Sequence, residues 1–168
     1  MGSTTSKGYP FPVGTDRVMD GDDAIRALAE AVDSDSRTSK ATTLGQSLTA
    51  QANNWVSWNA AAPNECELTK TNAYTWTVTL AGIYVVSAFA LTTGFQAIGA
   101  RSYMQLVMGP AANAWTARAS FAGENTCAPA LVAPLAVGDT ITFMCVPNAG
   151  TSIAAGTGIL TVARLGRT

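Results

Sequence analysis

The hydrophobic positions recur with a period of two from Trp55 onwards, and this pattern predicts β-strands. Residues 74–80 alternate large apolar side chains with threonines, which is typical of a strand with one buried face. Residues 83–93, IYVVSAFALTT, follow as a longer and more apolar strand. Its core-facing set is either Ile83 and the alternate residues after it or the opposite set, because periodicity leaves the register open.

Further short apolar segments between turn residues complete a mainly β chain. Pro129 falls within one of them and predicts that this strand lies at a sheet edge or carries a bulge. No crossover helix pattern interrupts the series, so we expect an antiparallel sandwich or jelly roll. The remaining predicted strands are residues 55–58, 65–69, 101–109, 115–121, 127–135, 140–146 and 157–165.

The period changes to a helical one near the beginning of the chain. Ile25, Leu28, Ala29 and Val32 have the i, i+3, i+4, i+7 spacing of one apolar helix face, and Asp20 is a suitable N-cap. A helix of about twelve residues is marginal alone in water, so this face must pack against a partner. The partner is the rest of the chain, other copies of the chain, or another protein.

An extended arm precedes this helix. Pro10 and Pro12 fix their own φ angles and favour extended geometry at Tyr9 and Phe11. Such an arm is suited to strand addition or to aromatic anchoring on a neighbouring protein. The predicted attachment residues are therefore Tyr9, Pro10, Phe11, Pro12, Ile25, Leu28 and Val32.

Composition divides the chain into three segments. Residues 34–54 are rich in Ser, Thr and Ala and predict a linker. They separate an arm and helix at 1–33 from a β domain at 55–168.

Charge is scarce, at 12% of residues against roughly 25% in typical soluble domains. A body this poor in charge favours burial between identical subunits. The net charge of −1 and the lack of a basic run argue against nucleic acid as a partner. The chain has no run of about 18 apolar residues, so no membrane span is predicted. The first ten residues lack the apolar core of a signal peptide.

The chain has no histidine, and its three cysteines form no CxxC pair. The common zinc patterns and the Cys–His nucleophile are thereby excluded. Cys127 and Cys145 can pair only if their strands are neighbours. We favour the alternative, in which Cys66, Cys127 and Cys145 are buried thiols.

The acidic residues do not predict a metal or catalytic site. The four carboxylates between Asp16 and Asp23 lack the ligand spacing of an EF-hand and are explained by helix capping. Glu65 and Glu67 share one face of a predicted strand at a separation that suits a glycosidase pair, but no histidine is present to act as a base. We therefore expect no enzymatic activity, no bound metal and no cofactor.

Exposed aromatic side chains are the candidate chemistry of the β domain. Aromatic rings stack on sugar faces and amides bind sugar hydroxyls, although the same rings also occur in cores and subunit interfaces. The candidate glycan-binding residues, in or beside predicted loops, are Phe95, Tyr103, Asn113 and Trp115.

Three segments of the β domain resemble the C1q/TNF-like jelly roll. They are GIYVVSAFAL at residues 82–91, LAVGDTITF at 135–143 and GTGILTVARL at 156–165. The resemblance implies a Gly-Tyr strand in the core, a Gly-Asp turn before an apolar strand, and a last strand near a threefold axis. It therefore implies a homotrimer.

Residues 8–33, GYPFPVGTDRVMDGDDAIRALAEAVD, resemble the opening of short virion proteins of phages that infect actinobacteria. These are minor tail or tail-fibre proteins, and in some cases head-fibre or decoration proteins. The resemblance implies an N-terminus attached to other virion proteins and an outward β domain. We expect a tail-associated trimer that recognises the host surface, with a cell-wall glycan as the candidate receptor. The alternative is a trimeric protein that stabilises the capsid.

Overall fold

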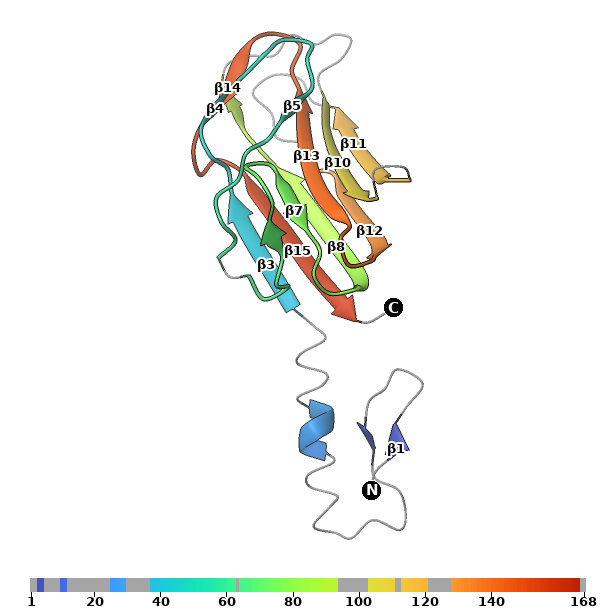
Figure 1. Ribbon diagram of the computed structural model, residues 1–168. Helices are drawn as coiled ribbons and strands as arrows, with labels where there is room; N and C mark the ends of the chain where they lie inside the picture. Colours follow the sequence, from blue (N-terminus) through green and yellow to red (C-terminus); the bar gives the residue numbers. More distant parts are fainter. Residues whose placement is uncertain are drawn as a thin grey trace.

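The computed structural model describes residues 3–4, 10–11, 25–29, 37–62, 64–93, 103–110, 113–120 and 128–166. Residues 37–166 contain two main antiparallel sheets packed face to face, with a small third sheet at one end (Figure 1). The predicted antiparallel jelly-roll sandwich is confirmed.

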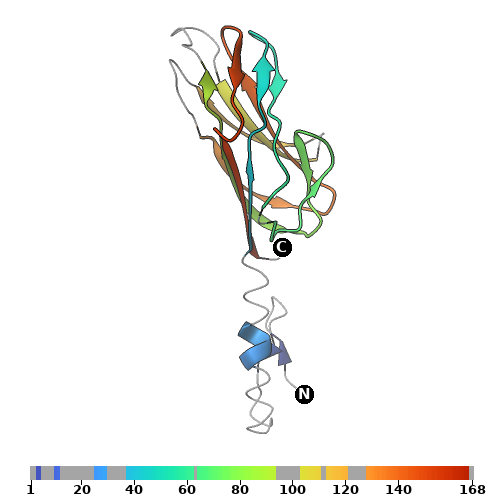
Figure 2. The same ribbon diagram turned by 90° about the vertical axis from the view of Figure 1, so that its left-hand side faces the viewer.

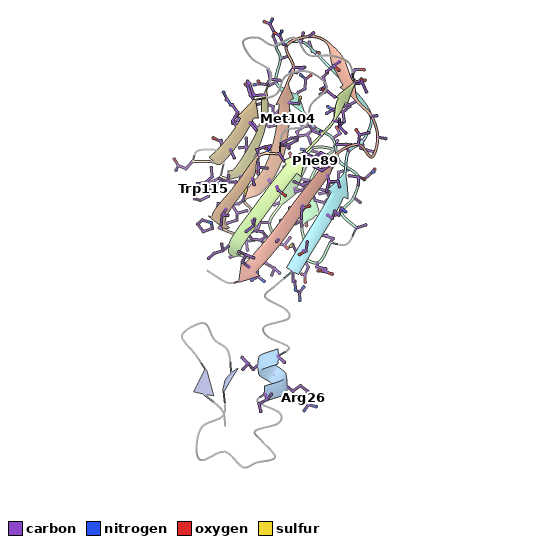
Figure 3. The ribbon with its side chains drawn as sticks, turned by 180° about the vertical axis from the view of Figure 1, so that it is seen from behind. Arg26, Phe89, Met104 and Trp115 are labelled. Atoms are coloured by element: carbon purple, nitrogen blue, oxygen red, sulfur yellow. The ribbon has the colours of Figure 1, made fainter. Side chains whose placement is uncertain are left out.

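The first sheet has four strands in the order β12-β8-β15-β3. Its two central strands, β8 and β15, pair along most of their length. Figure 3 looks onto this sheet from behind. The strands are β3 (Arg37–Thr42), β8 (Gly82–Phe89), β12 (Ala130–Leu135) and β15 (Ile159–Gly166).

The second sheet has the order β11-β10-β13-β7-β6, and β5 also pairs with β13. Its strands are β5 (Asn54–Trp55), β6 (Thr69–Lys70), β7 (Thr75–Thr77), β10 (Tyr103–Gly109), β11 (Trp115–Ser120) and β13 (Thr140–Val146). The small end sheet has the order β4-β14-β9. Its strands are β4 (Gln46–Leu48), β9 (Thr92–Thr93) and β14 (Thr151–Ile153).

The core lies between the two main sheets and fixes the register of β8. Tyr84, Val86 and Ala88 face inward, whereas Ile83 is exposed, so the second of the two open registers is the correct one. Tyr84 is fully buried, and its hydroxyl donates a hydrogen bond to Leu80 O at 2.7 Å. This bond satisfies the polar atom of a large core side chain.

The predicted linker is wrong for residues 37–54. Strand β3 pairs with β15 at six consecutive positions, from Arg37 to Thr42, and β4 pairs with β14. The polar composition concealed these strands because their backbone groups are paired while few large side chains are buried. Ser39 is buried and bonds to Asn64 Oδ1 at 3.1 Å, which satisfies its hydroxyl.

Two smaller predictions also need correction. Residues 65 and 66 form a turn rather than a strand, with Glu67 at a φ of 54°, and β6 begins only at Thr69. Residues 151–153, which lie outside the predicted strands, form β14 because both neighbouring strands supply backbone partners. Strand β13 has the predicted bounds.

Strand β12 is an edge strand, as the proline within residues 127–135 predicted. Pro134 lies within it opposite Ile83, and Pro129 is buried immediately before it. Because β12 has one neighbour, β8, the sheet loses few hydrogen bonds to these prolines.

The N-terminal segment is described at three places. Residues 25–29 are helical, within the predicted helix, and β1 (Ser3–Thr4) pairs with β2 (Pro10–Phe11). The helical residues lie outside the sandwich, beyond the end where β3 begins and β15 ends (Figures 1 and 2). None of the described helical residues belongs to a helix long and apolar enough to span a membrane.

Candidate recognition surfaces

The outward face of the four-stranded sheet is mostly apolar, with one polar row of Ser87, Thr161 and Lys40 across β8, β15 and β3. Its strands alternate, so the residues that do not enter the core project from this face, and Val132 is 59% exposed. Lys40 is the one charged residue that this alternation turns outward among the four strands. The apolar outward residues are Ile83, Val85, Phe89, Val132, Ile159, Ala163 and Leu165. We call this set the apolar face, and Ile83, Val132 and Leu165 are exposed in it.

The outward face of the six-stranded sheet carries a row of four residues from four adjacent strands. Trp55 of β5 lies opposite Met144 of β13, Met144 opposite Gln105 of β10, and Gln105 opposite Arg118 of β11. Neighbouring strands lie about 4.8 Å apart, so this cross-strand row spans about 14 Å. Met144 is itself only 6% exposed, so the row presents an indole at one end, a covered apolar position beside it, and a guanidinium at the other end.

The indole end is extended by a second exposed ring. Trp55 and Tyr74 are 39% and 37% exposed, and their rings stack with centroids 6.2 Å apart and planes 19° apart. Nearly parallel rings at this separation are offset sideways, so each leaves part of one face uncovered.

Side-chain amides hold both aromatic residues in place. Gln46 Nε2 donates to Trp55 O at 3.0 Å, and Asn54 Nδ2 donates to Thr49 O at 2.9 Å. Asn72 Oδ1 accepts the backbone N–H of Tyr74 at 2.9 Å. The backbone on which the rings are mounted is therefore fixed, and the rings form a pre-organised aromatic surface.

Hydrogen bonds and a ring contact likewise hold the guanidinium end of the row in place. Arg118 Nε and Nη2 donate to Gln105 Oε1 at 3.2 and 2.8 Å, and Arg118 Cζ lies 4.0 Å from the centroid of the Tyr103 ring. In the described part of the chain no carboxylate pairs with Arg118, and the described ion pair joins Arg37 to Glu67. Arg118 is thus an oriented cation that meets no counter-charge among the described residues.

Among the predicted glycan-binding residues, the structure separates Tyr103 from Trp115. Tyr103 and Trp115 lie at opposite ends of the β10–β11 hairpin, opposite Ser120 and Met108 respectively. Trp115 shares a face with the buried Met108, whereas Tyr103 lies under Arg118. Figure 3 shows Trp115 at the side of the sandwich. Asn113 is exposed just before β11, and Phe95 lies outside the described residues.

Sequence reasoning missed Trp55, Tyr74 and Arg118 as surface groups. The two rings were assigned to strands with buried faces, and their contact arises only because β5 and β7 both pair with β13. Nothing in the local sequence predicts that contact. The pairing of Gln105 with Arg118 follows from the register of the β10–β11 hairpin. The sequence alone does not fix that register.

The attachment residues are placed only in part. Pro10 and Phe11 form β2, and Ile25 is 60% exposed while Leu28 is half-buried. Tyr9, Pro12 and Val32 lie outside the described residues. Attachment therefore stays a prediction.

The glutamates considered for catalysis connect two segments of the fold. Arg37 Nη1 lies 2.7 Å from Glu67 Oε1, and Glu65 Oε2 accepts the Thr38 N–H at 3.2 Å. Both carboxylates therefore bind the turn at residues 65–67 to β3. Among the described residues, no group of three or more acids, cysteines or histidines is placed to hold a metal. The cluster between Asp16 and Asp23 lies outside them.

Two buried titratable groups lie near Arg164, which is itself buried and donates to Ala81 O through Nε and Nη2. Burial raises the pKa of Tyr84 to about 12, although Arg164 lowers it. Burial also raises the pKa of the Cys66 thiol. Cys66 and Cys145 are both buried, and Cys127 lies outside the described residues, so its pairing stays untested.

Comparison with known proteins identifies the architecture. No family model and no curated protein sequence matches the chain. The globular domain of zebrafish complement 1qA matches it with a TM-score of 0.53 at 13% identity, covering 78% of this chain and 98% of that one. The fold is a C1q/TNF-like jelly roll.

Two further structures share the C1q/TNF-like fold with this chain. Murine APRIL has a TM-score of 0.52 at 16% identity, with 77% of this chain and 100% of that chain covered. Vertex protein P5 of the phage PRD1 has a TM-score of 0.54 at 13% identity, with 78% and 96% covered. At these identities the similarity establishes the fold alone.

Proposed function

We propose that this chain is a non-enzymatic structural protein of a phage virion. It assembles as a homotrimer, its N-terminal segment attaches to other virion proteins, and its C1q/TNF-like domain faces outward to recognise the host surface. The preferred location is the tail.

The apolar face is the structural feature that best supports assembly as a trimer. Its exposed aliphatic side chains, such as Val132, lie on a sheet surface whose outward strand positions hold one charged residue, Lys40. Exposed apolar patches of this kind mark protein–protein interfaces. A closed symmetric assembly removes the face from water, and three copies give a weak surface site the advantage of avidity.

The position of the N-terminal segment supports attachment at one end of the molecule. Strand β3 begins at the end of the sandwich where β15 finishes, and helical residues 25–29 lie beyond that end (Figure 1). The opposite end of the sandwich carries β4 and β14. The resemblance of residues 8–33 to the opening of phage virion proteins supports the same orientation.

A capsid location is the second candidate. The similarity to the PRD1 vertex protein P5 favours it, because that protein is named for a vertex rather than a tail. In this case the trimer would stabilise shell subunits instead of binding cells.

Adsorption competition separates the two locations. We expect purified protein at micromolar concentration to slow phage adsorption to host cells, since free trimers would occupy the receptor. A protein that leaves adsorption unchanged but restores heat resistance to capsids stripped of it would overturn the tail assignment and support the capsid role.

A further inference from the structure

We propose that the cross-strand row, together with the stacked Trp55–Tyr74 pair, is a binding site for an anionic polysaccharide. Sugar rings stack on the two aromatic side chains, and a carboxylate or phosphate group of the same polymer binds Arg118. This inference names the receptor class for the proposed host recognition and rests on that function.

The aromatic end has the properties of a sugar platform. Trp55 and Tyr74 are exposed, nearly parallel and mounted on a backbone fixed by Gln46, Asn54 and Asn72. Exposed aromatic rings held rigidly have little conformational entropy to lose on binding, which is why they act as binding anchors. Apolar ring faces suit the C–H surfaces of sugars.

Amide donors lie at both parts of the site. Asn72 and Gln105 each use the side-chain oxygen as an acceptor, Asn72 for Tyr74 and Thr75, and Gln105 for Arg118. In the described part of the chain their amide nitrogens donate to no other group. Each amide therefore retains donors for sugar hydroxyls.

The guanidinium end supplies the charge preference. Gln105 and the Tyr103 ring orient Arg118 without neutralising it. The outward-facing strand positions around it, on β10, β11 and β13, carry no acidic residue among those described. An oriented guanidinium is the preferred protein group for binding carboxylate or phosphate oxygens.

The register places these groups along one line of the sheet. Trp55, Met144, Gln105 and Arg118 are directly opposed across four strands, so the backbone positions that carry the Trp55 indole and the Arg118 guanidinium lie about 14 Å apart on that line. A linear polymer lying perpendicular to the strands would contact both ends. A small anion alone would reach only Arg118.

The test uses Trp115→Phe protein, because Trp58 and Trp76 are buried and Trp55 is then the exposed indole among the described residues. The probes are oligogalacturonate, its neutral methyl ester, and phosphomannan, and the readout is tryptophan fluorescence during titration. We expect at least one anionic probe to change the signal, with the ester bound about tenfold more weakly. Carboxylate and phosphate sources are distinguished by which probe binds.

Two variants test which side chains contact the polysaccharide. Trp55→Ala and Arg118→Gln should each weaken binding about tenfold in a calorimetric titration of otherwise unchanged protein. Trp115→Ala is the matched control, because Trp115 is 40% exposed but projects from the other face of its sheet. Added salt should weaken binding by the unmodified protein more than binding by the Arg118 variant.

Three results would overturn the site: no binding of either anionic probe, equal binding of the ester, or equal losses in the Trp55 and Trp115 variants. Adsorption competition keeps this failure distinct from failure of the proposed function. If the Trp55 and Arg118 variants still block adsorption, the site is wrong and host recognition stands. If the unmodified protein binds polysaccharide but never affects adsorption, the host-recognition role fails.

Discussion

Gly158 lies where Thr43 and the end of β8 approach the start of β15. A Cβ at this position would lie 2.5 Å from Thr43 Cγ2 and 2.6 Å from Phe89 O. The second of these atoms belongs to the backbone, so a rotamer change cannot relieve the clash.

Gly158→Ala should therefore lower the free energy of unfolding by about 1–3 kcal/mol. Urea denaturation measures the change. Gly150→Ala is the matched control, since the nearest atom to its Cβ is Leu48 O at 3.9 Å. Equal stability of the two variants would show that β15 can shift away from β8.

Tyr84 gives stability a pH dependence in the alkaline range. Its pKa is about 12 in the folded protein against 10.0 for the unperturbed group, because burial favours the neutral phenol. The folded state therefore holds its proton more tightly than the unfolded state. This contribution is complete below pH 10 and is lost as the pH rises towards 12.

Tyr84→Phe should remove this dependence. The variant should be less stable at pH 8 by about 1 kcal/mol, since it lacks the hydrogen bond to Leu80 O. The difference between the two proteins should shrink between pH 10 and 12. Denaturation at each pH measures it, and a constant difference would mean that Tyr84 does not titrate in this range.

At the scale of elements, prediction from sequence succeeded where a strand is a continuous apolar run and failed where strands are polar. Strand β13 was located to the residue because its apolar run ends sharply at Pro147. Strands β3 and β14 were missed because RTSKAT and TSI carry few large apolar residues, and backbone pairing with distant strands holds them. The register of β8 needed the second sheet, because both its faces are apolar.

The two recognition surfaces were not predicted because they depend on contacts between strands distant in sequence. The surface around Arg118 depends on cross-strand register, and the Trp55–Tyr74 contact depends on where β5 and β7 meet β13. The local sequence predicts neither the cross-strand register nor the pairing of β5 and β7 with β13. Tyr103 and Trp115 of the predicted set lie at opposite ends of their hairpin and on different faces, because nearness to a loop does not specify which face a side chain projects from.

The pairing of β3 with β15 predicts where the folded β domain begins. Deletion of residues 1–33 should leave a protein with a cooperative thermal transition, because β3 and its pairs with β15 remain. Deletion of residues 1–44 should abolish that transition, since it exposes the edge of β15. Circular dichroism during heating distinguishes the two proteins.

The shorter deletion also tests attachment. The protein without residues 1–33 should fold but fail to join virus particles in a reconstitution assay. If it instead unfolds, the N-terminal helix belongs to the core of the domain.

For the whole molecule, the apolar face predicts how assembly can be disrupted. Val132→Glu should convert the trimer to monomers at low micromolar concentration, because it places a charge on the proposed interface. Val137→Glu should remain trimeric, since Val137 lies in the turn after β12 and does not belong to the apolar face. Sedimentation velocity measures both, and an unmodified protein that sediments as a monomer would contradict the trimer.

The prolines of β12 have a consequence for solubility. An open strand edge can template the addition of further chains and so seed fibrils. Pro134, within the edge strand, and Pro129, directly before it, interrupt the row of N–H groups that such growth needs. The proposed trimer can therefore form at high concentration without polymerisation along this edge, and a Pro134→Val change should make the protein prone to amyloid formation.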